Sequence, residues 1–159
     1  MYSSQLWNLT NSLPLQTADS SPGYFDIRFD SRIPEKMRIE LCRFINWVEG
    51  NYKLPIPLWV DFEYKHYLID RGGKRVGFLF YWVDFSDNPD FENADNIPQI
   101  LLPVRTEHSS TEEILSSFIE AITCYFAWIC GIIDEAYTPN TDEVEEILQA
   151  YLKWESHCS

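Results

Sequence analysis

The chain has 159 residues, of which 45% are apolar, 16% aromatic and 23% charged. This length and apolar fraction predict one compact domain over residues 1–159 and exclude a wholly disordered chain. The net charge of −13 argues against nucleic acid or an anionic membrane as the main partner.

The N-terminal segment and the cysteines carry no recognisable processing or metal motif. The first 27 residues contain no Lys or Arg and so lack the positively charged start of a secretory signal. We expect residues 1–22 to be loosely ordered. No two of the four cysteines form a CxxC pair or a paired metal spacing. The simplest interpretation is a reduced, cytoplasmic protein without a metal or another cofactor.

The first half of the chain changes between strand and helix patterns. Residues 24–29 alternate in hydropathy, which predicts a half-buried strand. Residues 33–49 place apolar side chains at helical spacing, with Pro34 in the first turn and Gly50 at the end. Residues 58–65 alternate again and predict a second strand.

A hairpin is expected after the second strand. Residues 70–74 contain two adjacent glycines that supply positive φ, which predicts a tight turn. The return segment 75–83 is apolar on both faces, so we expect a central strand that is covered twice. Residues 97–104 predict one more strand, and Pro98 and Pro103 place it near an edge of the sheet.

Two helices end the chain. Ser110 and Glu113 form a capping box that opens a helix over residues 111–133. The apolar part of this helix is long enough to span a bilayer, but Glu120 lies near its middle and acidic residues flank it. We therefore expect a buried core helix. Residues 141–155 predict a last, amphipathic helix.

The predicted order of elements is β-α-β-β-β-α-α. This order indicates an α+β fold with a mostly antiparallel sheet of about four to five strands packed with three helices, of which the 111–133 helix is buried. The sequence shows no internal domain boundary.

Motifs for phosphate binding and nucleophilic catalysis are absent from the sequence, which has no GxGxxG, GxxxxGKS/T or GxSxG. Glu120 is a candidate general acid, because burial in an apolar helix would raise the pKa of its carboxyl group. We favour a structural role for it, since ion pairs also perturb pKa values. His108 is the other candidate, and a hydrolase-type enzyme that uses Glu120 or His108 is our third hypothesis.

Residues 84–96 form the most polar stretch, with five acids and three asparagines. Such oxygen ligands suit Ca²⁺, but the residue order of an EF-hand loop is missing. We favour a solvated loop in which Asp and Asn side chains form turns around Pro89.

The negative charge is concentrated at the C-terminal end. Residues 106–159 contain 11 acids and one base, a net charge of −10, whereas residues 1–105 have a net charge of −3. Ordinary solubility explains such an excess. A surface that docks a basic protein explains it too, because its field would speed the encounter. The candidate partner-binding residues on this surface are Asp142, Glu143, Glu145, Glu146, Tyr137 and Trp154.

Our first hypothesis is a non-enzymatic interaction protein that neutralises or regulates a basic protein partner through this acidic helical face, as an immunity or antitoxin protein does. The alternative is a small-ligand-binding domain, which the 25 aromatic residues suggest although core packing explains most of them. The residues of that alternative ligand pocket are Trp59, Phe80, Trp82, Tyr125 and Trp128.

Overall fold

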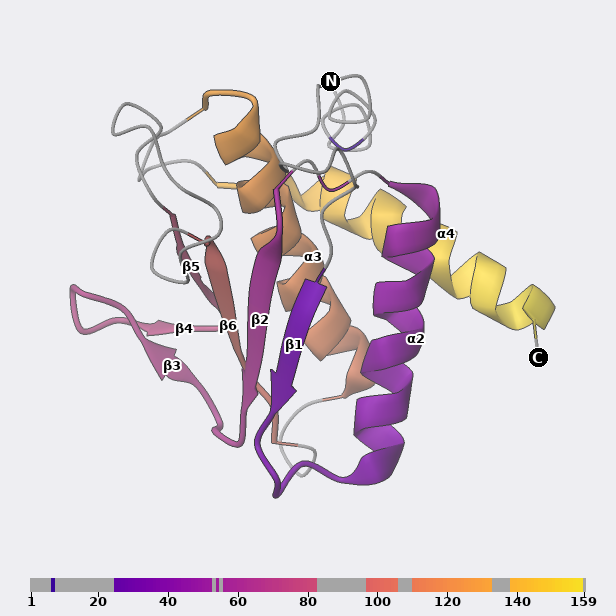
Figure 1. The fold of residues 1–159 in the computed structure, drawn as a ribbon, viewed down its shortest axis with the longest axis horizontal. Coiled ribbons are helices and arrows are strands. Elements are labelled where there is room, and N and C mark those ends of the chain that lie inside the picture. Colours follow the sequence, from indigo (N-terminus) through magenta and orange to yellow (C-terminus); the bar gives the residue numbers. More distant parts are fainter. Residues whose placement is uncertain are drawn as a thin grey trace.

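Figure 1 shows the fold as a computed structural model. It describes Trp7 and residues 25–52, 54, 56–82, 97–105, 110–132 and 138–158. The elements in chain order are β1 (Phe25–Phe29), α2 (Glu35–Asn51), β2 (Leu58–Glu63), β3 (Leu68–Ile69), β4 (Arg75–Val76), β5 (Leu79–Tyr81), β6 (Gln99–Pro103), α3 (Thr111–Ile129) and α4 (Thr141–Cys158). Helices and a mixed sheet confirm the predicted α+β class.

The main sheet has four strands in the order β1-β2-β6-β5, and it is mostly parallel. β1 pairs with β2 in parallel, β2 pairs with β6 in parallel, and only β5 is antiparallel to its neighbour β6. The prediction of a mostly antiparallel sheet is therefore wrong. β1 and β2 are parallel because α2 carries the chain from the carboxyl end of β1 back to the start of β2.

The expected hairpin is present, but its return strand differs from the prediction. β3 and β4 pair as a separate antiparallel sheet of two strands. The segment expected as one central strand is interrupted at Gly77, where an added Cβ would lie 3.0 Å from Oγ of Ser117 on α3. Beyond this close approach the chain forms β5, which lies at the sheet edge rather than in its centre.

β6 was expected near an edge and instead lies inside the sheet, between β2 and β5. The two prolines do not prevent this position, because Pro98 precedes the strand and Pro103 is its last residue. The carbonyl of Pro98 even accepts a hydrogen bond from Trp59 N–H at 3.0 Å. Proline is disfavoured in the interior of a central strand because it cannot donate to the ladder, and neither proline lies in the interior of β6.

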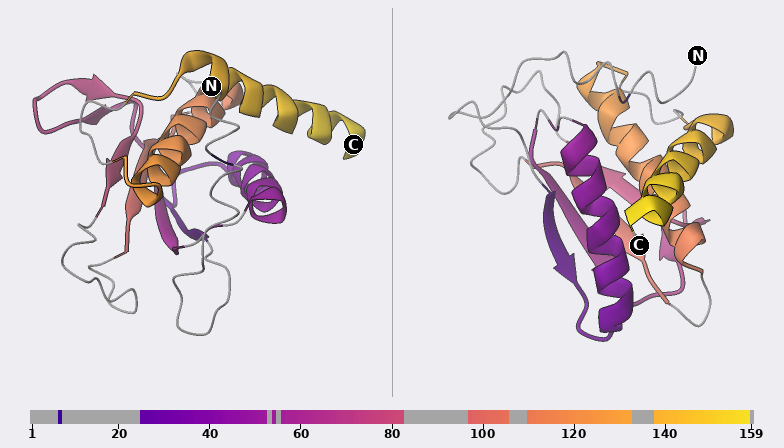
Figure 2. Two further views of the ribbon diagram at one scale, coloured as in Figure 1. Left: turned by 90° about the horizontal axis from the view of Figure 1, so that it is seen from above. Right: turned by 90° about the vertical axis from the view of Figure 1, so that its right-hand side faces the viewer.

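The described helices α2, α3 and α4 lie on one side of the sheet (Figure 2). The ring of Phe118 on α3 sits 5.5 Å from that of Phe62 on β2 and 5.3 Å from that of Phe44 on α2, so one residue joins three elements. α4 packs outside this layer, where Tyr151 lies 5.0 Å from Phe44. The expected inner face of α4 is buried at Val144, Ile147, Leu148 and Tyr151.

α3 is buried as predicted, but it ends at Ile129 rather than at residue 133. Gly131 has a φ of 85°, and the N–H groups of Gly131 and Ile132 bond back to the carbonyls of Trp128 and Ala127. This is the Schellman arrangement that closes a helix. At the other end, Ser110 accepts a hydrogen bond from Glu113 N–H at 3.2 Å, as the capping box predicts. In the described part of the chain, no helix is long and apolar enough to cross a membrane.

Most of the segment expected to be loosely ordered, residues 1–6 and 8–22, lies outside the described residues. Trp7 is described, and its side chain is fully buried. Its indole N–H donates a hydrogen bond of 2.9 Å to Oγ1 of Thr123 on α3, and its ring contacts Tyr52 and Phe126. Trp7 therefore belongs to the main core.

Candidate functional site

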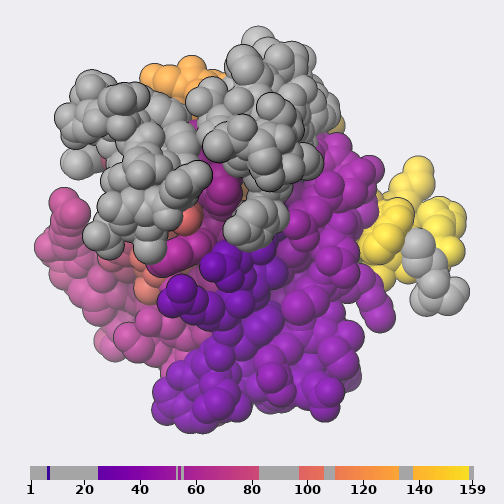
Figure 3. Space-filling view, viewed as in Figure 1, coloured from indigo at the N-terminus to yellow at the C-terminus, as the bar shows by residue number. Residues whose placement is uncertain are grey.

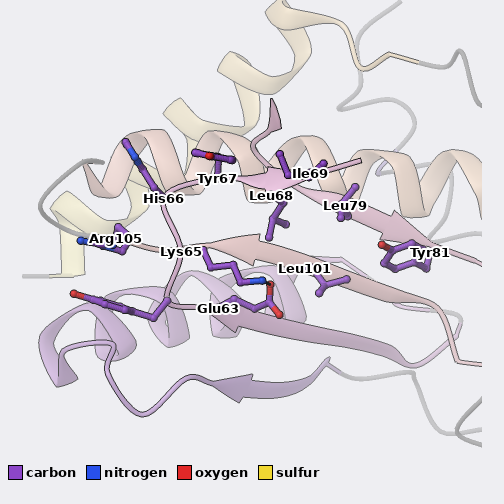
Figure 4. A pocket seen from close by; sticks show the side chains of 11 residues that line it. Glu63, Lys65, His66, Tyr67, Leu68, Ile69, Leu79, Tyr81, Leu101 and Arg105 are labelled. Atoms are coloured by element: carbon purple, nitrogen blue, oxygen red, sulfur yellow. Dashed lines mark ion pairs between the residues drawn. The ribbon is translucent and has the colours of Figure 1, made fainter. Parts of the chain in front are cut away.

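A groove of about 640 Å³ lies between the β3–β4 hairpin and the sheet (Figure 4). Its volume is in the range of small-molecule sites. Side chains from β2, β5 and β6 form its floor, and the segment from Tyr64 to Ile69 forms its wall. The lining residues are Glu63, Tyr64, Lys65, His66, Tyr67, Leu68, Ile69, Leu79, Tyr81, Leu101 and Arg105.

The alternation of the strands places the groove on the sheet face opposite to α3. Phe80 packs on Trp128 of α3, so its neighbours Leu79 and Tyr81 point to the other face. Leu101 is paired with Leu79 in the ladder and shares that face.

One apolar side chain of the hairpin is buried outside the main core. Leu68 is 4% exposed, yet it lies outside the cluster of residues that form the main core. Figure 4 shows Leu68 pointing from β3 into the groove. The burial of Leu68 therefore stabilises the position of the hairpin beside the sheet.

Basic residues gather at one end of the groove, where the parallel strands β2 and β6 reach their carboxyl ends. Ligands of open α/β sheets bind at this end of the strands. The guanidinium of Arg105 lies 4.9 Å from the ring centre of Tyr64, and that of Arg32 lies 5.0 Å from the same ring. Nζ of Lys65 is 3.7 Å from a carboxylate oxygen of Glu63.

Arg32 also pairs with Asp30 near this end of the groove. It donates two side-chain hydrogen bonds, of 3.0 and 2.9 Å, to the carboxylate of Asp30. These bonds to the charged form lower the pKa of Asp30 to about 2. This pair fixes Arg32 beside the ring of Tyr64.

The other end of the groove is apolar and open to solvent. Ile69 and Tyr81 line it and are 51% and 41% exposed, whereas Tyr67 lies beside His66, with 6.0 Å between the ring centres. Ile69 and Tyr81 are two of the seven large exposed hydrophobic side chains in the described part of the chain. Exposed apolar side chains that cluster in this way mark interaction sites more often than scattered ones do.

The predicted partner-binding residues are distributed over α4. Asp142, Glu145 and Glu146 are exposed on its first two turns, whereas Glu143 is 7% exposed and burial raises the pKa of its carboxyl group. Trp154 is 37% exposed. It lies eight residues after Glu146, which corresponds to about 12 Å along the helix. Tyr137 lies outside the described residues.

The residues predicted to line a ligand pocket lie on both faces of the sheet. Phe80 contacts both Trp82 and Trp128, at 5.6 and 6.3 Å between ring centres, and Trp128 contacts Tyr125. Tyr125 and Trp128 are buried, so these contacts belong to the core. Trp59 lies on the opposite sheet face, under the guanidinium of Arg28 at 4.7 Å.

Of the two candidate catalytic residues, the structure describes Glu120 and not His108. Burial raises the pKa of Glu120 on α3, and no base of the described chain lies within ion-pair distance of it. Cys124 follows one turn later, and burial, with a smaller effect of Glu120, raises its pKa to about 12. His108 and the acidic loop 84–96 lie outside the described residues. Within those residues, no group of His, Cys, Asp and Glu could hold a metal ion.

Sequence reasoning missed the groove, although one signal was available. Residues 64–82 contain four bases, one acid and six aromatic residues in a chain with a net charge of −13.

Comparison with family models, curated proteins and solved structures found no match to this chain.

Proposed function

We propose that this protein is a non-enzymatic binding protein that holds a basic protein partner on the outer face of α4. The observation that carries the proposal is that one face of this helix is apolar and buried and the other is acidic and exposed. Val144, Ile147 and Leu148 bury its inner face, while Glu145 and Glu146 stand exposed on the outer one. The specific form of this proposal is an immunity protein, an acidic protein that covers a cationic toxin.

The charges of the outer face support this proposal. Among the described residues, Glu155 of α4 pairs with Arg43 at 3.7 Å, whereas no base lies within ion-pair distance of Asp142, Glu145 or Glu146. A field that local bases do not neutralise attracts a cationic partner over about one Debye length, roughly 8–10 Å. Trp154 adds an exposed ring of the kind that anchors protein interfaces.

The test is a pull-down from a lysate of the native host at low salt, repeated at high salt, with mass spectrometry of the retained proteins. The variant Glu145→Lys/Glu146→Lys reverses two charges on the outer face of α4. The matched control Glu35→Lys/Glu112→Lys reverses two exposed acids in the first turns of α2 and α3.

We expect a stoichiometric basic protein that is retained by the wild type and by the control. It should be lost with the α4 variant and at high salt, because both remove the attraction. A partner retained equally by both variants, or an empty column at low salt, contradicts the proposal. Circular dichroism of each variant shows whether the fold is intact.

A further inference from the structure

A second cavity, of about 510 Å³, lies between the turn of the β3–β4 hairpin and β5. Residues 70–72 of the turn line one side of it, and residues 79–82 line the other. β5 is an edge strand of the main sheet, and the hairpin projects from the sheet on this side, away from α2 (Figure 1). The volume of the cavity is sufficient for a small organic ligand.

The side of the cavity that β5 forms is aromatic. Phe80 and Trp82 alternate with Tyr81, so they share the face of β5 that packs on α3. The ring of Phe80 lies 6.3 Å from that of Trp128, and the ring of Trp82 stacks on Phe80 with 5.6 Å between the ring centres. Among the described residues, Phe80 is the only ring in contact with Trp82, which is 37% exposed. A planar ring placed on Trp82 would therefore continue this row of rings into the cavity.

The turn of the hairpin supplies an unpaired cation. In the part of the chain that the structure describes, no ion pair involves Arg71, and its side chain is exposed. The neighbouring acid is already bonded, because the carboxylate of Asp70 accepts hydrogen bonds of 2.9 Å from the N–H groups of Gly72 and Lys74. Residues 70–75 contain three bases and one acid, a net charge of +2. This turn therefore attracts a carboxylate, which a guanidinium can bind through two parallel hydrogen bonds.

We propose that this cavity binds a small planar aromatic carboxylate. The ring of the ligand stacks on the exposed indole of Trp82, and its carboxylate binds the guanidinium of Arg71. This site lies between the hairpin and β5, whereas the proposed partner surface lies on α4, so the proposal does not depend on the protein partner.

Isothermal titration calorimetry with three probes tests the chemistry. 2-Naphthoate has the planar ring and the carboxylate, 2-naphthol has the ring without the charge, and decahydro-2-naphthoate has the carboxylate on a saturated ring system. We expect 2-naphthoate to bind about tenfold or more tightly than 2-naphthol, which lacks the charge-assisted hydrogen bonds. It should bind about two- to tenfold more tightly than decahydro-2-naphthoate, because a saturated ring cannot stack. Equal affinity for 2-naphthoate and either of the other probes, or no binding of 2-naphthoate, overturns the proposal.

Two variants locate the site. Arg71→Gln should weaken 2-naphthoate binding about tenfold or more and leave 2-naphthol binding unchanged. Trp82→Leu keeps an apolar side chain at a partly exposed position, and it should remove the preference for 2-naphthoate over decahydro-2-naphthoate. Circular dichroism of each variant shows whether the fold is intact.

Each variant has a matched control. Lys74→Gln removes an exposed cation of the same turn that does not line the cavity. Trp154→Leu removes an indole that is also 37% exposed but lies on α4. Both controls should bind 2-naphthoate as the wild type does. Binding of 2-naphthoate that is unchanged in Arg71→Gln and in Trp82→Leu assigns the ligand to another surface and overturns the proposal.

Discussion

Trp7 connects the N-terminal segment to α3 through one buried hydrogen bond. Thr123 accepts this bond from the indole and donates its own hydroxyl proton to the carbonyl of Ile119 at 2.7 Å. We expect Trp7→Phe to lower the free energy of unfolding by about 2–3 kcal/mol. About 1 kcal/mol of this is the lost hydrogen bond, and the rest comes from the cavity left by the smaller ring. Urea unfolding followed by circular dichroism measures the change.

Substitutions at Thr123 separate the hydrogen bond from the packing. Thr123→Val keeps the volume but leaves the indole N–H buried without an acceptor, which costs about 1–3 kcal/mol. Thr123→Ser keeps the hydroxyl and removes one methyl group, about 0.8 kcal/mol. A Val variant that is as stable as the Ser variant would show that the hydrogen bond does not stabilise the fold.

At the scale of elements, the hairpin that walls the groove depends on its turn. Strands of two residues are marginal by themselves. Asp70 accepts hydrogen bonds of 2.9 Å at its carboxylate from the N–H groups of Gly72 and Lys74, and Gly73 has a φ of 82°. We expect Gly73→Ala to lower the free energy of unfolding by about 1–2 kcal/mol, because an L-residue is strained at positive φ.

Gly72→Ala is the matched control in the same turn. An added Cβ there meets only the Asp70 carboxylate, at an ordinary contact distance of 3.4 Å. Urea unfolding of both variants tests the prediction, and equal losses of stability would contradict the role assigned to the φ of Gly73.

The elements also show what the sequence could predict. The burial of Leu58, Val60 and Phe62 followed from the alternation of β2, because alternation is a local property. Which strand pairs with which depends on where distant segments meet, so the parallel order of β1, β2 and β6 was missed. β5 is apolar on both faces, which predicted a central strand. The face opposite to α3 lines the groove instead of packing against a second layer.

The candidate site was hidden for the same reason. The bases and aromatic residues of 64–82 were visible in the sequence as a local excess. Arg105 lies more than 40 residues after Tyr64, and only the parallel pairing of β2 with β6 brings the two side chains together. The acidic residues of α4 were easier to find, because they follow one another in the sequence.

The whole molecule combines a basic hairpin with an acidic last helix, which lie apart on its surface (Figure 3). Net charges of −3 for residues 1–105 and −10 for residues 106–159 describe the same asymmetry. The two surfaces therefore attract molecules of opposite charge, and substitutions in the hairpin should leave partner binding at α4 unchanged.

Acids whose pKa is raised and acids whose pKa is lowered together determine how the stability of the whole molecule depends on pH. Burial raises the pKa of Glu120 and Glu143 above the ordinary value of 4.5. The folded state therefore holds protons on these groups that the unfolded state has lost, and stability rises as the pH falls from 7 toward about 4.5. Asp30 acts in the opposite sense, because its pKa is lowered to about 2. Its contribution is lost below about pH 4, where the unfolded state takes up the proton first.

We therefore expect the midpoint of urea unfolding to be higher at pH 5 than at pH 7 and to fall again below about pH 4. Relief of repulsion among the acids acts in the same direction above pH 4, so variants are needed to separate the two causes. Glu120→Gln removes a half-buried charge and should be more stable than the wild type at pH 7, with a smaller difference at pH 5. Glu145→Gln removes an equal charge from an exposed position and should show a smaller gain at pH 7. A Glu120→Gln variant that is less stable than the wild type at pH 7 would mean that the carboxylate of Glu120 stabilises the fold in its charged form.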